Sequence, residues 1–191
     1  MAATVKLYAF SGDTGWGLSL GFKEYVERIK IQFGFELSEY GDNVYQINLT
    51  GIVQDILAQP PERMIVILGY SLGANALAWL QLALLNYCNL RNLPVRDITL
   101  LVGFDPTKNG PSLNLYPIES HVKRCLLFRQ RAWWFPTSLM FGRGQYARRA
   151  NGPQIEVTDV YEDHWFLQGD RNLQKICTDV ILTEERKWKA A

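Results

Sequence analysis

Short apolar runs rich in β-branched residues alternate along this chain with segments of helical periodicity. The runs cover residues 4–10, 43–49, 63–69, 97–104, 123–130 and 154–160. They show little polar alternation, which is typical of strands buried on both faces of a parallel sheet. Their alternation with helices predicts right-handed crossovers and a doubly wound, mostly parallel sheet of about six strands in a three-layer α/β/α sandwich.

Apolar residues at helical spacing separate these runs. One series lies between the first two runs and comprises Leu18, Phe22, Val26, Ile29 and Phe33. Segment 52–57 predicts a short helix that ends before Pro60. Segment 74–90 is apolar nearly all round, which predicts a helix buried in the core. Asp170 is expected to cap a last helix that turns inward Leu173, Ile176, Val180 and Ile181.

The bulk properties predict one domain over residues 1–191. The composition, 48% hydrophobic and 20% charged, is ordinary for a globular protein long enough to bury a core. A net charge of +1 gives no reason to expect a nucleic-acid partner. The N-terminus lacks the pattern of a signal peptide, so we expect a cytoplasmic protein. The cysteines lie far apart, which predicts buried free thiols at Cys88, Cys125 and Cys177.

The pattern Gly-x-Ser-x-Gly occurs twice, at residues 17–21 and 69–73. A nucleophilic serine in this pattern needs a strand that runs into the turn and a helix that leaves it. Ser71 satisfies both conditions, because an apolar run precedes it and a helical segment follows it. Ser19 follows a segment that reads as a loop, so we interpret its match as adventitious.

The expected turn also suits Ser71 electrostatically. A serine between a strand and a helix sits at the positive end of the helix dipole. The backbone N–H of Leu72 would then point to where an oxyanion forms. The alternative is a tight glycine-rich turn with an inert serine. A serine hydroxyl is in any case a poor nucleophile until a neighbouring base takes its proton.

The chain offers two histidines as the base. Chemistry in an open parallel sheet lies beyond the carboxyl ends of the strands. His121 precedes the run 123–130 and is therefore at the wrong end. His164 follows the run 154–160, which places it at the same edge as Ser71. The alternative for His164 is a surface or capping histidine.

Asp105 is the leading candidate for the acid that holds the imidazole. It ends an apolar run and is followed by Pro106, which favours an extended exit from the strand. The next run, 125–130, ends without an acid. Asp159 and Asp163 are close in sequence to His164 and are less favoured as the acid. Asp163 remains an alternative to Asp105. An Asp-Pro turn that caps local amides is the alternative for Asp105.

The order Ser71, Asp105, His164 resembles that of the α/β-hydrolase superfamily. The resemblance covers nearly the whole chain, in a short form that begins at the first parallel strand. The acid in Gly-x-Asp-Pro is similar to that of lipases of the pancreatic type, and the small size and Gly-Tyr-Ser turn are similar to cutinases. The resemblance implies a small esterase-like or lipase-like member.

The segment after the first strand departs from the pattern of many members of that superfamily. They carry His-Gly there, and the following backbone amides complete the oxyanion hole. This chain has Ser11, Gly12 and Asp13. We expect these three residues to supply the second oxyanion donor beside Leu72. Gly12 permits a close approach of the backbone and Ser11 offers a hydroxyl, whereas the carboxylate of Asp13 would repel an oxyanion.

The resemblance implies acyl transfer through an acyl-enzyme on Ser71. His164 takes the proton from Ser71 and later protonates the leaving group, and water then repeats the sequence. The substrate would be a small-molecule ester or thioester, with no metal and no cofactor. Two alternatives stay open: an acyltransferase on the same three residues, and a non-catalytic binding protein that kept the fold.

Residues 120–155 contain no acidic residue but seven cations, with aromatic residues among them. The long connections 105–122 and 131–153 read as functional loops. We predict that Tyr70, Trp133 and Trp134 contact the substrate. A contact with a membrane surface would also suit this mixture of aromatics and cations. The alternative is a solvated loop whose tryptophans pack against the sheet.

Overall fold

The computed structural model describes residues 4–12, 19–41, 46–107, 117–131, 145–149 and 151–190. Within these ranges the main sheet is parallel and has six strands. In spatial order they are β2 (Glu36–Tyr40), β1 (Val5–Phe10), β3 (Met64–Tyr70), β4 (Leu100–Phe104), β6 (Cys125–Gln130) and β8 (Ile155–Val160). The predicted doubly wound, mostly parallel sheet of about six strands is therefore confirmed.

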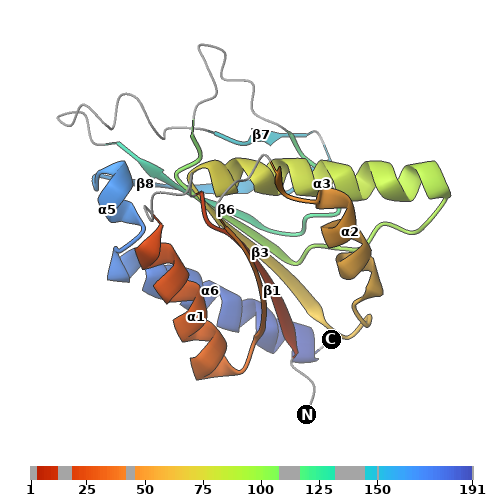
Figure 1. The fold of residues 1–191 in the computed structure, drawn as a ribbon, viewed down its shortest axis with the longest axis horizontal. Coiled ribbons are helices and arrows are strands. Elements are labelled where there is room, and N and C mark those ends of the chain that lie inside the picture. The colour runs from red at the N-terminus through yellow and green to blue at the C-terminus, as the bar shows by residue number, and fades with distance from the viewer. Residues whose placement is uncertain are drawn as a thin grey trace.

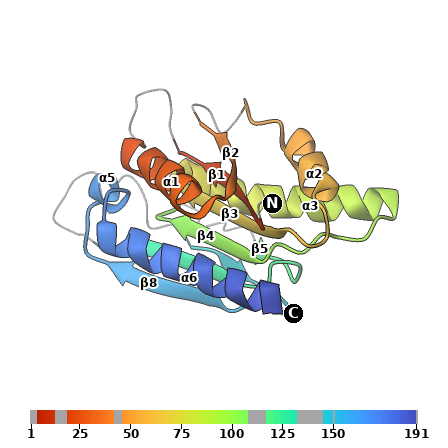
Figure 2. The same ribbon diagram turned by 90° about the horizontal axis from the view of Figure 1, so that it is seen from below.

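The strand order reverses between β1 and β3. The chain passes from β1 outward to β2 and then returns to the other side of β1, from where it builds towards β8 (Figure 2). Ligands of open α/β sheets bind beyond the carboxyl ends of the strands at such a reversal. The edge of the sheet next to the ends of β1 and β3 is therefore the expected place for a binding site.

Helices cover both faces of the sheet, which confirms the three layers. Helices α1 (Leu20–Phe33) and α6 (Arg171–Ala190) lie on one face, and α2 (Leu49–Ala58) and α3 (Leu72–Arg91) lie on the other (Figure 1). A short helix, α5 (His164–Leu167), follows β8. Alternate residues of β1 enter the two cores: Leu7 packs on the side of α1 and α6, and Tyr8 on the side of α2 and α3.

A second strand was predicted at residues 43–49, but none forms over 46–49, the part of that range that the structure describes. The second strand is β2 at Glu36–Tyr40, and Leu49 already belongs to α2. Asn48 caps this helix, because its side chain accepts a hydrogen bond from the N–H of Gly51 at 3.0 Å. Strand β2 lies at the border of the sheet and exposes polar side chains, so it carries no apolar run.

Other expectations can be compared with the described residues. The side chain of Asp170 accepts from the backbone N–H of Asn172 at 2.7 Å and of Leu173 at 3.2 Å, so the predicted cap of α6 is present. The three cysteines are buried free thiols, and burial raises the pKa of Cys177 to about 12. Parts of the long connections form a small parallel sheet of β5 (Pro117–Ile118) and β7 (Ala147–Arg148).

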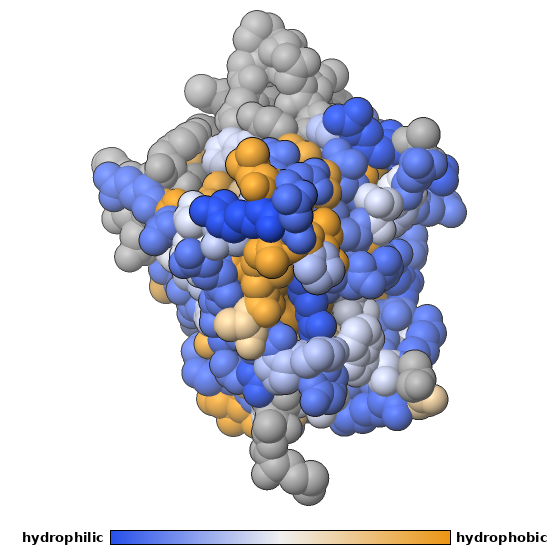
Figure 3. All heavy atoms as spheres, turned by 90° about the vertical axis from the view of Figure 1, so that its right-hand side faces the viewer, coloured by the Kyte–Doolittle hydropathy of each residue, from blue (hydrophilic) through white to orange (hydrophobic). Residues whose placement is uncertain are grey.

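The end of the molecule opposite α5 carries exposed apolar side chains. Figure 3 shows this face, where a band of apolar side chains lies between hydrophilic ones. Leu90, at the end of α3, is 81% exposed, and Leu93 follows it in the chain. Among the described residues, no helix has the length and apolarity needed to cross a membrane.

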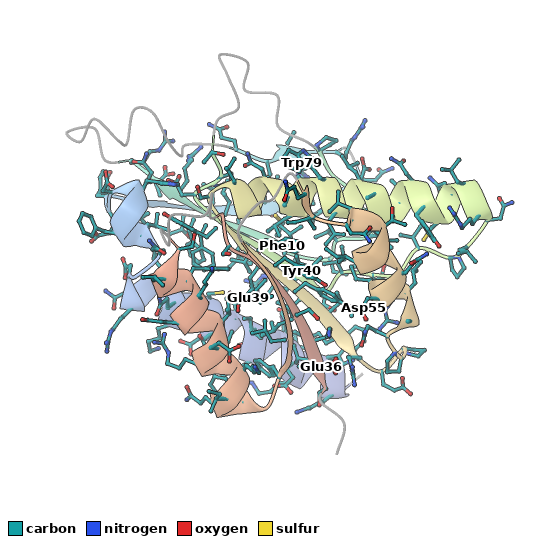
Figure 4. The ribbon with its side chains drawn as sticks, viewed as in Figure 1. Phe10, Glu36, Glu39, Tyr40, Asp55 and Trp79 are labelled. Atoms are coloured by element: carbon teal, nitrogen blue, oxygen red, sulfur yellow. The ribbon has the colours of Figure 1, made fainter. Side chains whose placement is uncertain are left out.

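A buried lysine on β1 ties the border strand β2 and helix α2 to the sheet. The ammonium of Lys6 lies 2.8 Å from a carboxylate oxygen of Glu36, and Arg63 contacts the other oxygen at 2.6 Å. The hydroxyl of Tyr8 donates to Asp55 of α2 at 2.7 Å. The ammonium of Lys6 also lies 3.9 Å from Oδ2 of Asp55, and Figure 4 labels Glu36 and Asp55 near the same end of the sheet. The hydrogen bond from Lys6, together with the charge of Arg63, holds the pKa of Glu36 below its usual value.

We expect Glu36→Gln to destabilise the protein at pH 7 and to have no effect in acid. The carboxylate is 44% exposed, so solvent screening limits the loss to about 0.5–1 kcal/mol. Its folded pKa is lowered, so its contribution is present above the unfolded pKa and is lost as the pH falls through the folded value. Urea unfolding at pH 7 and at about pH 3 measures both effects.

Asp179→Asn is the control, because Asp179 pairs with Lys175 in a mostly exposed position on α6. It should change the free energy of unfolding by less than about 0.5 kcal/mol at either pH. A deficit of Glu36→Gln that is equally large at both pH values would contradict this account of the cluster.

Candidate active site

Three residues predicted from the sequence meet at the carboxyl edge of the sheet. Ser71 follows β3, Asp105 follows β4, and His164 begins α5 after β8. Nε2 of His164 lies 3.0 Å from Oγ of Ser71, and Nδ1 lies 2.6 Å from Oδ2 of Asp105. All three residues are buried, with exposed fractions of 7%, 0% and 1% for Ser71, Asp105 and His164. The structure thus brings the three into one hydrogen-bonded line.

The backbone at Ser71 is held in a sparsely populated conformation. Its φ is 57° and its ψ is −123°, a region that costs a non-glycine residue about 1–3 kcal/mol. Its N–H donates to the carbonyl of Phe104 at 2.9 Å and its carbonyl accepts from Ala74 at 3.0 Å. The two flanking glycines permit the turn: a Cβ at Gly73 would collide with the carbonyl oxygen of Phe10, and one at Gly69 would lie 2.6 Å from the carbonyl oxygen of Gly73.

Asp105 is fixed from three directions. Its N–H donates to the carbonyl of Phe128 at 2.7 Å, Oδ1 accepts from the N–H of Gln130 at 3.2 Å, and Oδ2 faces His164. A carboxylate only accepts hydrogen bonds, so Nδ1 of His164 carries the proton and Nε2 is left to accept one. Asp163, the alternative acid, is buried at the start of α5, whereas the imidazole nitrogen faces Asp105.

Tyr70 lies beneath the imidazole and not at the surface. Its hydroxyl donates to the main-chain carbonyl of His164 at 2.7 Å, and the two rings stack with centroids 5.2 Å apart. Burial, followed by the charges of Asp105 and Asp163, raises the pKa of Tyr70 well above its usual value, so the hydroxyl stays a donor. Tyr70 is 1% exposed. The prediction that it contacts a substrate is therefore wrong.

The segment after β1 touches the turn at Ser71. A Cβ at Gly12 would lie 2.6 Å from the backbone nitrogen of Leu72 and 2.7 Å from Cβ of Ser71. Ser11, by contrast, points away: its N–H donates to the carbonyl of Tyr40 at 3.0 Å, and its hydroxyl is directed to the same oxygen at 3.5 Å. The expectation that Ser11 donates to an oxyanion is not met in this arrangement. Asp13 lies outside the described residues.

Two side chains that the sequence did not single out connect α3 to the loops of the site. The amide of Asn75 donates to the carbonyl and the hydroxyl of Thr107, at 3.2 and 3.0 Å. The hydroxyl of Tyr146 donates to the carbonyl of Ala74 at 2.6 Å. Asn75 follows Ser71 by four residues, about one helical turn. This spacing is the sequence feature that could have placed Asn75 near the site.

The remaining predicted residues lie elsewhere or outside the described ranges. His121 is buried between β5 and β6, away from the carboxyl edge, and Ser19 directly precedes α1. Trp133 and Trp134 belong to the residues that the structure does not describe. Five cations of segment 120–155 lie in the described ranges and pair with acids, so their charges are balanced within the protein: Lys123, Arg124, Arg129, Arg131 and Arg149. In the described ranges, no group of three or more possible metal ligands occurs.

Several solved structures share the fold of this chain at low sequence identity. The sequence matches no family model and no curated protein. Among solved structures, the RedJ thioesterase from the prodiginine pathway of Streptomyces coelicolor is 13% identical, with a TM-score of 0.55 over 96% of this chain and 86% of its own. Human thioesterase 2 is 12% identical, with a TM-score of 0.53 over 97% and 98%. A putative hydrolase of the α/β superfamily from Xanthomonas campestris is 15% identical, with a TM-score of 0.52 over 94% and 99%. This chain therefore has the α/β-hydrolase fold that the sequence predicted.

Proposed function

We propose that this protein is a serine hydrolase that cleaves an ester or thioester through an acyl-enzyme on Ser71. The observation that carries the proposal is the buried line from Ser71 through His164 to Asp105, with separations of 3.0 and 2.6 Å. Each residue has the chemistry that its place requires: a hydroxyl, an imidazole whose Nε2 faces that hydroxyl as an acceptor, and a carboxylate that stabilises the positive imidazole.

The reaction would proceed in two steps. Oγ of Ser71 attacks the carbonyl carbon as its proton passes to Nε2 of His164, and the carbonyl oxygen becomes an oxyanion next to the backbone N–H of Leu72. The imidazolium then protonates the leaving alcohol or thiol, which leaves the acyl group on Ser71. Water loses a proton to the same nitrogen, attacks the acyl-enzyme and releases a carboxylic acid. No atom of a metal or cofactor takes part in these steps.

The similar structures favour the same class of reaction. Two of them are described as thioesterases, and a cutinase-like protein from Cryptococcus sp. is 13% identical with a TM-score of 0.51 over 96% of this chain. At such identities these structures support the fold and not the substrate. The proposal therefore rests on the geometry around Ser71, with small-molecule esters and thioesters as the expected substrates.

Ser71→Ala should abolish hydrolysis. We expect kcat/KM for p-nitrophenyl acetate and for an acetyl thioester to fall by at least about 10³-fold, because the nucleophile is removed. Labelling by a fluorophosphonate probe should disappear with it. Ser19→Ala is the matched control, since Ser19 belongs to the second Gly-x-Ser-x-Gly match, and it should retain both activity and labelling.

Three outcomes would contradict or redirect the proposal. Labelling that persists in Ser71→Ala would remove Ser71 as the nucleophile. A folded wild-type protein that neither reacts with the probe nor hydrolyses any ester would favour the non-catalytic alternative. Added alcohols or thiols that outcompete water for the acyl group would identify an acyltransferase on the same residues.

Tyr70→Phe should lower kcat without changing KM. The substitution keeps the ring beneath the imidazole but removes the hydrogen bond to the carbonyl of His164, so the imidazole is held less firmly against Ser71. We expect kcat and the rate of fluorophosphonate labelling to fall by about tenfold, as for the loss of one buried hydrogen bond. Steady-state kinetics and timed labelling measure these effects.

Tyr25→Phe is the control for this variant. Tyr25 is also a buried tyrosine, and its hydroxyl lies 3.2 Å from that of Thr178 on α6, away from the three residues. Both variants should lose similar thermal stability, whereas only Tyr70→Phe should lose reactivity. Equal reactivity in the two variants would show that the tyrosine beneath the imidazole serves stability alone.

A further inference from the structure

A hollow opens at the carboxyl edge of the sheet, two strands away from the proposed nucleophile. It has a volume of about 570 Å³, within the range of pockets that bind small molecules. Its walls come from the end of β2, with Glu39, Tyr40 and Gly41, and from residues 46–48 with the first turn of α2. We call it the β2–α2 pocket. The proposed mechanism makes no use of it.

Sheet register places this pocket at a defined distance from Ser71. Phe10 pairs with Tyr40 on one side and with Gly69 on the other. Neighbouring strands are about 4.8 Å apart, so the ends of β2 and β3 are separated by about 10 Å. Ser71 follows Gly69 by two residues. An extended chain of about three peptide units spans this distance.

Among the described residues, the segment Ser11–Gly12 lies between the pocket and the nucleophile. A Cβ at Gly41, in the wall of the pocket, would lie 3.1 Å from Oγ of Ser11. On the other side, a Cβ at Gly12 would lie 2.7 Å from Cβ of Ser71. One layer of closely packed main chain therefore separates the pocket from the place where the oxyanion would form, and a substrate chain would have to cross it at the edge of the sheet.

The position of His164 decides which part of a substrate can point towards the pocket. The leaving group has to stay within reach of Nε2 of His164, which comes from the β8 side of Ser71. The β2–α2 pocket lies on the opposite side, beyond β1. Since the leaving group occupies the β8 side, the acyl part of the substrate can extend towards the β2–α2 pocket.

The lining of the pocket suits an uncharged chain with some capacity for hydrogen bonds. Tyr40 stacks on Phe10 with ring centroids 5.0 Å apart, and these two lie together beside β2 in Figure 4. Ile47 and Ile52 add apolar surface, and Gln46 and Asn48 add amide groups. The charges nearby are of both signs: Glu39 lines the pocket and the ammonium of Lys23 approaches Gly41. No single sign of charge is favoured in a ligand.

We propose that the β2–α2 pocket binds the far end of an uncharged, extended acyl chain whose carbonyl carbon is attacked by Ser71. The inference rests on the proposed hydrolase function and adds to it the class of acyl group. The apolar surface favours a chain of about nine atoms over an acetyl group, and the two amides favour a chain that itself contains an amide.

Three p-nitrophenyl esters test this inference, because their leaving group is the same and only the acyl chain differs. They are the acetate, the nonanoate and the ester of N-hexanoylglycine, whose chain has the length of nonanoate but contains an amide. Gln46→Trp fills the pocket from an exposed position. Gln54→Trp is the matched control, because Gln54 is exposed on α2 but lies outside the pocket.

We expect Gln46→Trp to raise KM for both long esters by about tenfold and to leave the acetate unchanged. Gln54→Trp should leave all three unchanged, and the wild type should hydrolyse the N-hexanoylglycine ester with the lowest KM. Equal kinetics of Gln46→Trp and wild type on the long esters would overturn the inference while the proposed function stands. So would an equal loss on the acetate. A wild type that hydrolyses none of the three would overturn the proposed function and this inference with it.

Discussion

Close packing of backbone against backbone at the ends of β1 and β3 is the constraint on which the site depends. Gly12, Gly69 and Gly73 each occupy a place where a Cβ would collide with, or crowd, a neighbouring main chain. This contact lets the chain reverse sharply at Ser71, in a conformation that a serine adopts at a cost. The surrounding sheet and α3 offset that cost, and the reversal points the hydroxyl out of the sheet edge towards His164.

Burial gives the three residues their electrostatic character. Asp105 is fully buried, and such a carboxylate is costly unless it is paired and hydrogen-bonded. Here it accepts from the imidazole and from the N–H of Gln130. The ring of Tyr70 stacks on the imidazole, and its hydroxyl donates a hydrogen bond to the main-chain carbonyl of His164. Each group therefore restricts the orientation of the imidazole, which transfers the proton in the proposed reaction.

Features that depend on local sequence pattern were predictable. Strands buried on both faces gave continuous apolar runs, and the rule that chemistry lies at the carboxyl edge separated His164 from His121. Border strand β2 was missed because its exposed and half-buried positions carry mostly polar side chains and give no apolar run. The roles of Tyr70 and Ser11 were misjudged because they depend on contacts between residues far apart in sequence, 94 positions for Tyr70 and His164. No pattern in the sequence reports such a contact.

The most direct test of the account is a crystal structure of the protein after reaction with a small organophosphate ester. The account predicts a covalent bond from Oγ of Ser71 to phosphorus, with the phosphoryl oxygen facing the N–H of Leu72 and Nε2 of His164 within hydrogen-bonding distance of the adduct. An adduct on another residue would contradict it. So would an adduct on Ser71 with the imidazole turned away from both Ser71 and Asp105.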